Sequence, residues 1–162
     1  MRRDIARRAI SLIAVPLAVA CGAEPVASRA LTAVQGISDL VSASHSGLRE
    51  ARRFVVSDEP GWASLWSAIH SDVTPEPARP GVNLAEQIVI VAALGERPTG
   101  GFAIHIDSVR SGSGGREVFV TTSTPGPTCM TTQALTQPVH AVSAPVVAGP
   151  TRFVETETRG KC

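Results

Sequence analysis

The stretch Gln87-Ile-Val-Ile-Val-Ala-Ala-Leu94 decides how the rest of this chain can fold. From Ile88 to Leu94 every residue is apolar and several are β-branched, which is the pattern of a central strand covered on both faces. Apolar and polar side chains alternate in the next stretch, Phe102-Ala-Ile-His-Ile-Asp107, as expected where successive residues of a strand point to opposite faces. We therefore expect two neighbouring strands in the core.

The segment between these strands reads Gly-Glu-Arg-Pro-Thr-Gly-Gly and predicts a tight turn. Pro98 presets φ for the first corner of a type I turn, and Gly100 can adopt the left-handed conformation that closes it. Arg97 would then pair with Gly101 across the neck of the turn. The prediction is a buried β-hairpin over residues 87–109.

This pairing gives the predicted hairpin two unlike faces. Leu94 would lie opposite Ile104 on a large apolar face, which we expect to belong to the core. Ala93 would lie opposite His105 on the second face, where small side chains leave room beside His105 and Asp107. The second face is therefore a possible pocket for a small ligand.

The tip of the hairpin is another candidate site. Arg97 and Thr99 are not required by the turn, and the guanidinium of Arg97 suits a carboxylate or a backbone carbonyl. A structural role is also open, because Thr99 could close the turn with a local hydrogen bond. Arg97 could likewise pair with Glu96 or Glu117. The candidate binding tip consists of Arg97, Pro98, Thr99, Gly100, Gly101 and Phe102.

The N-terminus has the features of a bacterial export signal. Four arginines precede the apolar run Ala9–Ala20, which is too short to span a membrane as a helix. The run ends in Leu-Ala-Val-Ala-Cys-Gly, which resembles a lipoprotein signal and makes Cys21 the expected lipid attachment site. Ordinary cleavage nearby, with Cys21 unmodified, is the alternative. We expect the protein in the bacterial cell envelope, anchored to the membrane through Cys21, with its folded part on the extracytoplasmic side.

Removal of residues 1–20 as a signal peptide changes the charge balance. The full chain has 15 basic and 14 acidic residues, and loss of four arginines and one aspartate leaves 11 basic and 13 acidic residues. This balance, without a basic cluster, argues against nucleic acid as a partner. Residues 21–35 have the composition of a flexible tether, so we expect a single domain over residues 36–162.

The remaining segments predict an α+β protein that is mainly β. An amphipathic helix is expected around Trp62 and Trp66, whose side chains we expect to anchor it to a sheet rather than to stack on a ligand. Short turns between neighbouring strand candidates favour antiparallel pairing. We expect a twisted antiparallel sheet or partly closed barrel of about seven strands with the helix packed on it. The further strand candidates are residues 37–44, 52–57, 117–122, 138–147 and 152–158.

Motifs for catalysis or cofactor binding are sparse. Cys129 with His140 is the one local pair that could supply a nucleophile and its base. In an exported chain, a disulfide between Cys129 and Cys162 is a simpler use for the two cysteines that remain beside Cys21. The four histidines lack metal-binding spacing, and P-loop, dinucleotide and G-x-S-x-G motifs are absent from the sequence. We therefore expect no catalysis, no metal and no cofactor.

Three short motifs together resemble a known family. They are Trp62-x-x-x-Trp66, Gly95-Glu-Arg-Pro-Thr-Gly-Gly-Phe102 and Thr136-Gln137-Pro138. In this order they resemble the C-terminal domain family of PrcB, the accessory lipoprotein subunit of a bacterial surface protease complex, over about residues 37–162. Phe102 stands where that family commonly has tyrosine. The resemblance implies a noncatalytic role in binding and stabilising an exported protease.

Two functional classes therefore stay open. The first is a lipid-anchored module that binds a protein, such as a protease or another envelope component. The second is a binding protein for a small ligand or a peptidoglycan fragment, which would use Arg97, His105 and Asp107 on the second face of the hairpin. The first class predicts an exposed apolar patch or an open strand edge, and the second predicts a closed concave pocket.

Overall fold

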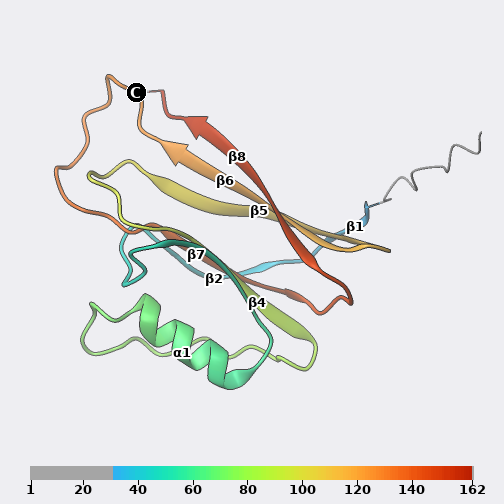
Figure 1. Ribbon diagram of the computed structural model, residues 1–162. Helices are drawn as coiled ribbons and strands as arrows, with labels where there is room; N and C mark the ends of the chain where they lie inside the picture. The colour runs from blue at the N-terminus through green and yellow to red at the C-terminus, as the bar shows by residue number, and fades with distance from the viewer. Residues whose placement is uncertain (1–30, 162) are drawn as a thin grey trace, which may run out of the picture.

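The computed structural model describes residues 31–161, which form two sheets and one helix (Figure 1). The strands are short to medium in length, and α1 lies between the third and the fourth of them. The elements are β1 (Leu31–Gln35), β2 (Ser38–Ala43), β3 (Ala51–Val56), α1 (Glu59–Ile69), β4 (Gln87–Leu94), β5 (Ala103–Gly112), β6 (Gly115–Thr124), β7 (Val139–Pro145) and β8 (Thr151–Arg159).

The elements stack in three layers. The middle sheet has the strand order β2-β7-β4-β3, and the outer sheet has the order β1-β5-β6-β8. Figure 1 shows the outer sheet on one side of the middle sheet and α1 on the other. Pairing is antiparallel except between β6 and β8, which run parallel. The sheets do not close into a barrel. The prediction of a mainly β fold with one packed helix is confirmed.

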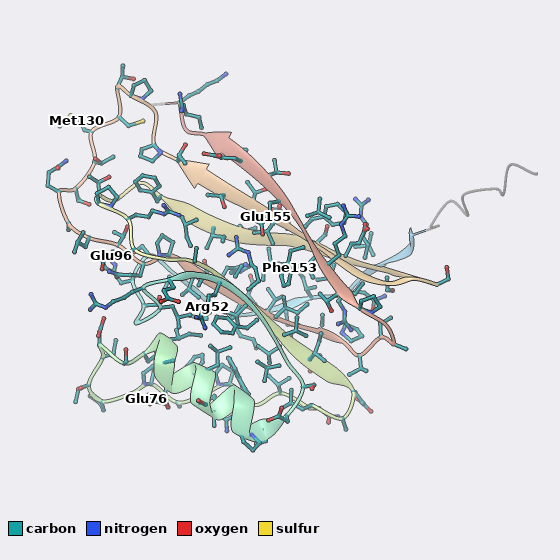
Figure 2. All side chains as sticks on the ribbon, in the orientation of Figure 1. Arg52, Glu76, Glu96, Met130, Phe153 and Glu155 are labelled. Carbon is teal, nitrogen blue, oxygen red and sulfur yellow. The ribbon has the colours of Figure 1, made fainter. Side chains whose placement is uncertain are left out.

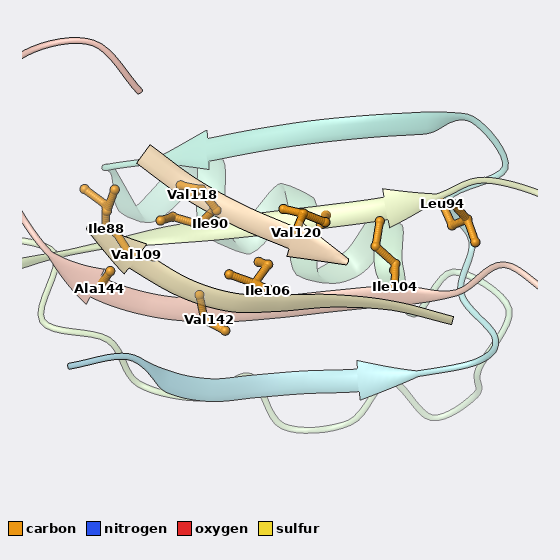
Figure 3. Packing of buried hydrophobic residues seen from close by; sticks show 11 residues of the cluster. Ile88, Ile90, Leu94, Ile104, Ile106, Val109, Val118, Val120, Val142 and Ala144 are labelled. Atoms are coloured by element: carbon orange, nitrogen blue, oxygen red, sulfur yellow. The ribbon is translucent and has the colours of Figure 1, made fainter. Parts of the chain in front are cut away.

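β4 is the strand around which both parts of the core form, and every residue after Gln87 is buried. Ile88 and Ile90 belong to the cluster between the two sheets, which Figure 3 shows together with Val118 and Val120. Val89 and Val91 belong to the cluster between the middle sheet and α1. The uninterrupted apolar run is therefore explained by cover on both faces, as predicted.

α1 joins the middle sheet through its two tryptophans. Asp58 caps the helix, because its side chain accepts a hydrogen bond from the N–H three residues later at 2.8 Å. Trp62 and Trp66 are buried, and their indole N–H groups donate to Pro80 O at 3.2 Å and to Pro77 O at 2.9 Å. The tryptophans therefore fix both the helix and the proline-rich loop that follows it. No helix within residues 31–161 is long and apolar enough to cross a membrane.

The predicted hairpin over residues 87–109 is wrong. β4 pairs with β3 and β7 in the middle sheet, whereas β5 pairs with β1 and β6 in the outer sheet. Leu94 and Ile104 do share a core, but as facing layers rather than as a cross-strand pair. Ala93 faces α1 instead, and His105 is exposed on β5. β4 is apolar on both faces, and α1 covers only one of them. The outer sheet, which contains β5, therefore stacks on the other face.

The outer sheet begins within the segment that the sequence predicts to be a tether. β1 pairs with β5, with Gln35 opposite Val109, so the last five residues of segment 21–35 belong to the fold. The predicted signal peptide, Cys21 and Cys162 lie outside the described residues. The lipid attachment site and the disulfide partner therefore stay predictions.

Candidate functional site

Two segments that are far apart in the chain lie side by side beyond the end of β4. Arg97 N donates to Thr136 O at 2.8 Å, and Thr136 N donates to Arg97 O at 3.0 Å. The hydroxyl of Thr136 also donates to Thr99 O at 2.9 Å. Two of the three sequence motifs, residues 95–102 and residues 136–138, therefore form one structural unit, which we call the motif unit.

Gln137 and Pro138 fasten the motif unit to the middle sheet. Leu94 N donates to Pro138 O at 2.8 Å, and the side-chain amide of Gln137 donates to Glu96 Oε2 at 3.2 Å. The hydroxyl of Ser46 donates to Gln137 O at 2.9 Å. Ser46 and Gln137 are both buried, so these bonds satisfy polar groups that water does not reach. These bonds hold the motif unit against the middle sheet.

The glycines of the motif unit differ from the prediction. Gly101 has the left-handed conformation, with φ of 85°, and Gly100 does not. Gly100 instead packs against Thr132: its N–H donates to Thr132 O at 3.0 Å, and an added Cβ would lie 2.3 Å from Thr132 Oγ1. The predicted pairing of Arg97 with Gly101 is absent, because Arg97 pairs with Thr136. The segment is a crossover between sheets, whose path the type I hairpin turn does not describe.

Arg97 lies half-buried within the motif unit rather than on an exposed rim. Its Nη2 donates to Leu94 O at 2.9 Å, and its guanidinium lies 5.9 Å from the centre of the Phe102 ring. Its Nε is buried without a hydrogen-bond partner. The alternative partners are engaged elsewhere, since Glu96 pairs with Arg49 at 3.2 Å. The side chain therefore has a structural role and still presents part of its guanidinium to the adjoining cavity.

A cavity of about 550 Å³ opens beside Arg97 and Phe102 between the two sheets. Its walls come from the motif unit, β4, β6 and β8, and they carry hydroxyl, carboxylate and guanidinium groups. The lining residues are Leu94, Arg97, Phe102, Thr122, Thr124, Glu155, Thr156 and Glu157. Near this cavity Arg53 of β3 binds Glu155 of β8 with two parallel hydrogen bonds of 2.8 and 2.9 Å. This pair joins the edges of the two sheets; Glu155 is labelled in Figure 2.

A loop with two exposed apolar side chains lies next to the motif unit. Residues 125–135 contact it through Thr132 and through Pro125, which would lie 3.1 Å from a Cβ added to Gly101. Met130 in this loop is fully exposed and projects from the molecule in Figure 2, and Leu135 is 55% exposed. Apolar side chains therefore stand out in solvent on the same side as the motif unit.

His105 and Asp107 do not form the predicted pocket. Both are exposed on β5, and Asp107 Oδ2 accepts a hydrogen bond from the Thr121 hydroxyl at 2.7 Å. The ring of His105 stacks on that of His140, with a centroid distance of 4.2 Å and an interplanar angle of 24°. This side of β5 therefore lacks the concave site that a ligand pocket with Ala93 would have required.

Cys129 and His140 are placed differently from a nucleophile and its base. His140 is buried in the core, where Nδ1 accepts from Ile106 N–H at 2.8 Å and Nε2 faces Asp39. Cys129 is in loop 125–135, and its Sγ accepts from Gly126 N–H at 3.2 Å. Both ring nitrogens of His140 thus face other groups. Residues 31–161 also contain no group of three or more side chains placed to hold a metal ion.

The loop that carries Cys129 also meets the C-terminal end of the chain. Gly160 N donates to Thr124 O at 2.8 Å, and a Cβ added to Gly126 would lie 2.5 Å from Gly160 O. This arrangement brings the segment that precedes Cys162 close to the loop. It is compatible with the predicted disulfide.

Arg116 forms a second polar link between the sheets, distant from the motif unit in sequence. It is buried at the start of β6, and its guanidinium donates to Thr151 Oγ1 at 3.1 Å and to Pro145 O at 3.2 Å. Burial lowers the pKa of Arg116. The link stays charged at neutral pH because an arginine titrates far above it.

A comparison with family models matches the part of the chain that contains the motif unit. Residues 88–145 match the model described as PrcB C-terminal. This part of the chain is similar to the PrcB C-terminal family. The match runs from β4 to the end of β7 and contains the whole motif unit, so the family resemblance predicted from the sequence is confirmed. Comparison with curated proteins and with solved structures finds no match.

Sequence reasoning missed the contacts that build this site. The bridge between Arg97 and Thr136 and the pair between Arg53 and Glu155 both join distant segments. One signal was available for the first contact, because both PrcB-like motifs occur in the same family pattern. No local pattern pointed to the second.

Proposed function

We propose that this PrcB-like chain is an exported, lipid-anchored, noncatalytic module that binds an extracytoplasmic protein, with a protease as the first candidate partner. One observation carries the proposal: residues 95–102 and 136–138, both within the family match, come together beside a cavity and an exposed apolar loop. We call this region, comprising the motif unit, the cavity and loop 125–135, the motif end.

The chemistry of the motif end suits a protein partner. Met130 and Leu135 offer flexible and branched apolar side chains, which commonly anchor protein–protein contacts when they are exposed. β8 lines the cavity and is the last strand of the outer sheet, so its free edge can accept hydrogen bonds from an added strand. An apolar anchor next to an open strand edge supports the binding of an extended partner segment.

A pair of double variants tests this proposal. Met130→Gln with Leu135→Gln removes the exposed apolar side chains, and Val73→Gln with Val146→Gln is a matched control at positions that are each 51% exposed. The partner is identified by crosslinking in cells and mass spectrometry, and its affinity for the purified chain is then measured. The first variant is expected to bind about tenfold more weakly or worse, and the control is expected to bind normally. Equal binding by both variants would contradict the proposal.

The cavity favours a second candidate function, the binding of a small polar ligand such as a peptidoglycan fragment. Its volume of about 550 Å³ falls in the range typical of small-molecule sites. NMR titration with defined peptidoglycan fragments distinguishes this function from the first. Saturable shifts confined to Phe102, Thr122 and Thr156 would support a ligand site, and unchanged spectra at millimolar fragment would exclude one for these compounds.

Membrane attachment is tested separately from partner binding. Cys21→Ser should move the protein from the membrane fraction to the soluble fraction, because a single cysteine carries the proposed lipid. A variant that stays fully membrane-bound in high salt would show that the anchor is something else.

A further inference from the structure

His140 connects the two sheets through its side chain. It belongs to β7 of the middle sheet and is 0% exposed. Its Nδ1 accepts a hydrogen bond of 2.8 Å from the backbone N–H of Ile106, which belongs to β5 of the outer sheet. The ring of His105 stacks on the face of the His140 ring. A side chain of one sheet therefore serves as the acceptor for a backbone donor of the other.

The backbone N–H of Ile106 depends on this acceptor because β1, the neighbour on that edge of β5, does not pair with Ile106. β1 pairs with β5 only from Val109 to Gly112, and the ladder between β5 and β6 is irregular between Ile106 and Ser108. Ile106 is itself fully buried. A buried backbone N–H without a partner costs free energy comparable to a lost hydrogen bond. Loss of the His140 acceptor would therefore separate the two sheets locally at Ile106.

The geometry makes the bond sensitive to protonation. Since Nδ1 accepts, the proton of the neutral ring is on Nε2, which lies 3.2 Å from Asp39 Oδ1 but has no well-aligned hydrogen-bond partner. A second proton would have to bind Nδ1. It would then face the N–H of Ile106, which is also a donor. Protonation of His140 therefore breaks the bond rather than weakening it.

Charged groups face the ring from β5 and from β2. Burial first, and then the nearby His105, lower the pKa of His140, whereas Asp39 and Asp107 act in the opposite direction. The other polar links between the sheets, through Arg53 and Arg116, involve guanidinium groups that keep their charge throughout this range. The bond of His140 therefore differs from them in responding to mild acid.

The bond between His140 and Ile106 lies next to the motif end. His140 lies two residues after Pro138, and Ile106 lies four residues after Phe102, so each partner directly follows one arm of the motif unit. We propose that the bond between His140 and Ile106 is a clasp that holds the sheets together beside the motif end and is released by mild acid. Its influence on a partner rests on the proposed function, whereas the clasp itself does not.

Hydrogen exchange read by NMR tests the clasp without any partner. Between about pH 7.5 and pH 5.0, the protection factor of the Ile106 amide should fall as the His140 ring titrates. The fall should be about tenfold, the change expected when one buried N–H loses its hydrogen bond. Amides of β4, such as that of Val91, should keep their protection. Constant protection at Ile106 while His140 gains its proton would overturn the proposal.

Three variants and one control variant sharpen the test. Asp39→Asn should move the midpoint of release to lower pH, and His105→Gln should move it to higher pH, because the two side chains act on the charge of His140 in opposite senses. His140→Gln should remove the pH response if it folds; if it does not, the two opposite shifts still decide. His45→Gln, at an exposed histidine that contacts Ser44, is the control and should shift nothing. Shifts of both variants in the same direction would overturn the clasp.

A binding measurement separates the clasp from its regulatory role. With an identified partner, affinity should fall over the same pH range as the protection of Ile106, and His140→Gln should make affinity independent of pH in that range. A clasp that opens without any change in affinity would overturn the regulatory link. A motif end that binds no partner would instead contradict the proposed function and leave the exchange result standing.

Discussion

The middle sheet is covered on both faces, by α1 and by the outer sheet, whereas the outer sheet is covered on one face only. β4 accordingly buries every residue after Gln87, while β5 alternates between exposed and buried positions in its first half. The free face of the outer sheet carries polar contacts, such as Thr121 with Asp107 and Ser123 with Thr158. From this difference we expect substitutions in the middle sheet to cost more stability than substitutions on the free face of the outer sheet.

The largest expected effect falls on the helix side of the middle sheet. Trp62→Ala should lower the free energy of unfolding by about 3–5 kcal/mol, because Trp62 is 0% exposed and its loss leaves a cavity. Phe119→Ala on the outer sheet, where Phe119 is half-buried beneath Arg110, should cost about 1 kcal/mol. Urea unfolding of both variants measures the difference. Equal losses of unfolding free energy in the two variants would contradict the difference that we expect between the sheets.

The predicted disulfide ranks next, because it would strengthen one end of the outer sheet. A bond between Cys129 and Cys162 would close a loop of about 33 residues, which corresponds to about 3–4 kcal/mol in the chain-entropy model. Cys162→Ser should lower the free energy of unfolding by about this amount, and reductant should then have no further effect. Mass spectrometry of the mature protein checks the bond directly, and free thiols at both positions would contradict it.

A smaller effect is expected at the crossover between the sheets. Gly101→Val should destabilise the protein by about 1–3 kcal/mol, because Gly101 has a φ of 85° and a Cβ there would meet Pro125 at 3.1 Å. Gly100→Ala should cost less, since the obstacle is the hydroxyl of Thr132, which can rotate. Thermal unfolding of both variants decides, and the reverse order would contradict the larger role assigned to Gly101.

The contact between the two sheets at His140 should become less stable as the pH falls. The folded state lowers the pKa of His140 from 6.5, so the unfolded chain binds the proton more readily. This contribution to stability is complete above pH 6.5 and is lost as the pH falls below it, by up to about 1.4 kcal/mol for each pH unit. Urea unfolding of wild type and His140→Gln from pH 7.5 downward should diverge in this sense; parallel curves would contradict it.

The smallest expected effect falls on the exposed loop. Met130→Gln with Leu135→Gln should change the free energy of unfolding by less than about 0.5 kcal/mol, because neither side chain belongs to a core cluster. Thermal unfolding checks this value. A large loss would mean that the loop supports the fold, and any loss of partner binding by this variant would then need another explanation.

The sequence predicts elements well and their partners poorly. The burial of β4, the cap at Asp58 and most strand bounds follow from local patterns, which depend on residues a few positions apart. The pairing of β4 and β5 failed, because Pro98 with two glycines fits a hairpin turn locally, whereas stacking over β4 is decided by the whole core. The bridge from Arg97 to Thr136 spans a distance in sequence that no turn rule covers.

For the candidate site, too, the sequence predicted local features well and contacts between distant segments poorly. The sequence placed residues 95–102 within a stretch that the family model matches, but it assigned Arg97 to an exposed rim and His105 to a pocket. In the structure the backbone and side chain of Arg97 serve the motif unit, and His105 stacks on His140. These roles depend on which strands face each other, and that information lies in three-dimensional packing rather than in spacing.

The place of β7 in the middle sheet has a consequence for how the chain is made. β7 lies between β2 and β4, with Val142 opposite both Asp39 and Ile90, although it follows them by a long stretch of chain. A ribosome or a secretion channel that delivers the chain from its N-terminus therefore releases β2 and β4 before the strand that joins them exists. The middle sheet is completed only at the end of delivery, and non-local pairing of this kind forms slowly. Late assembly would keep the chain threadable during the export that we propose, and it leaves the apolar strands in need of protection until β7 arrives.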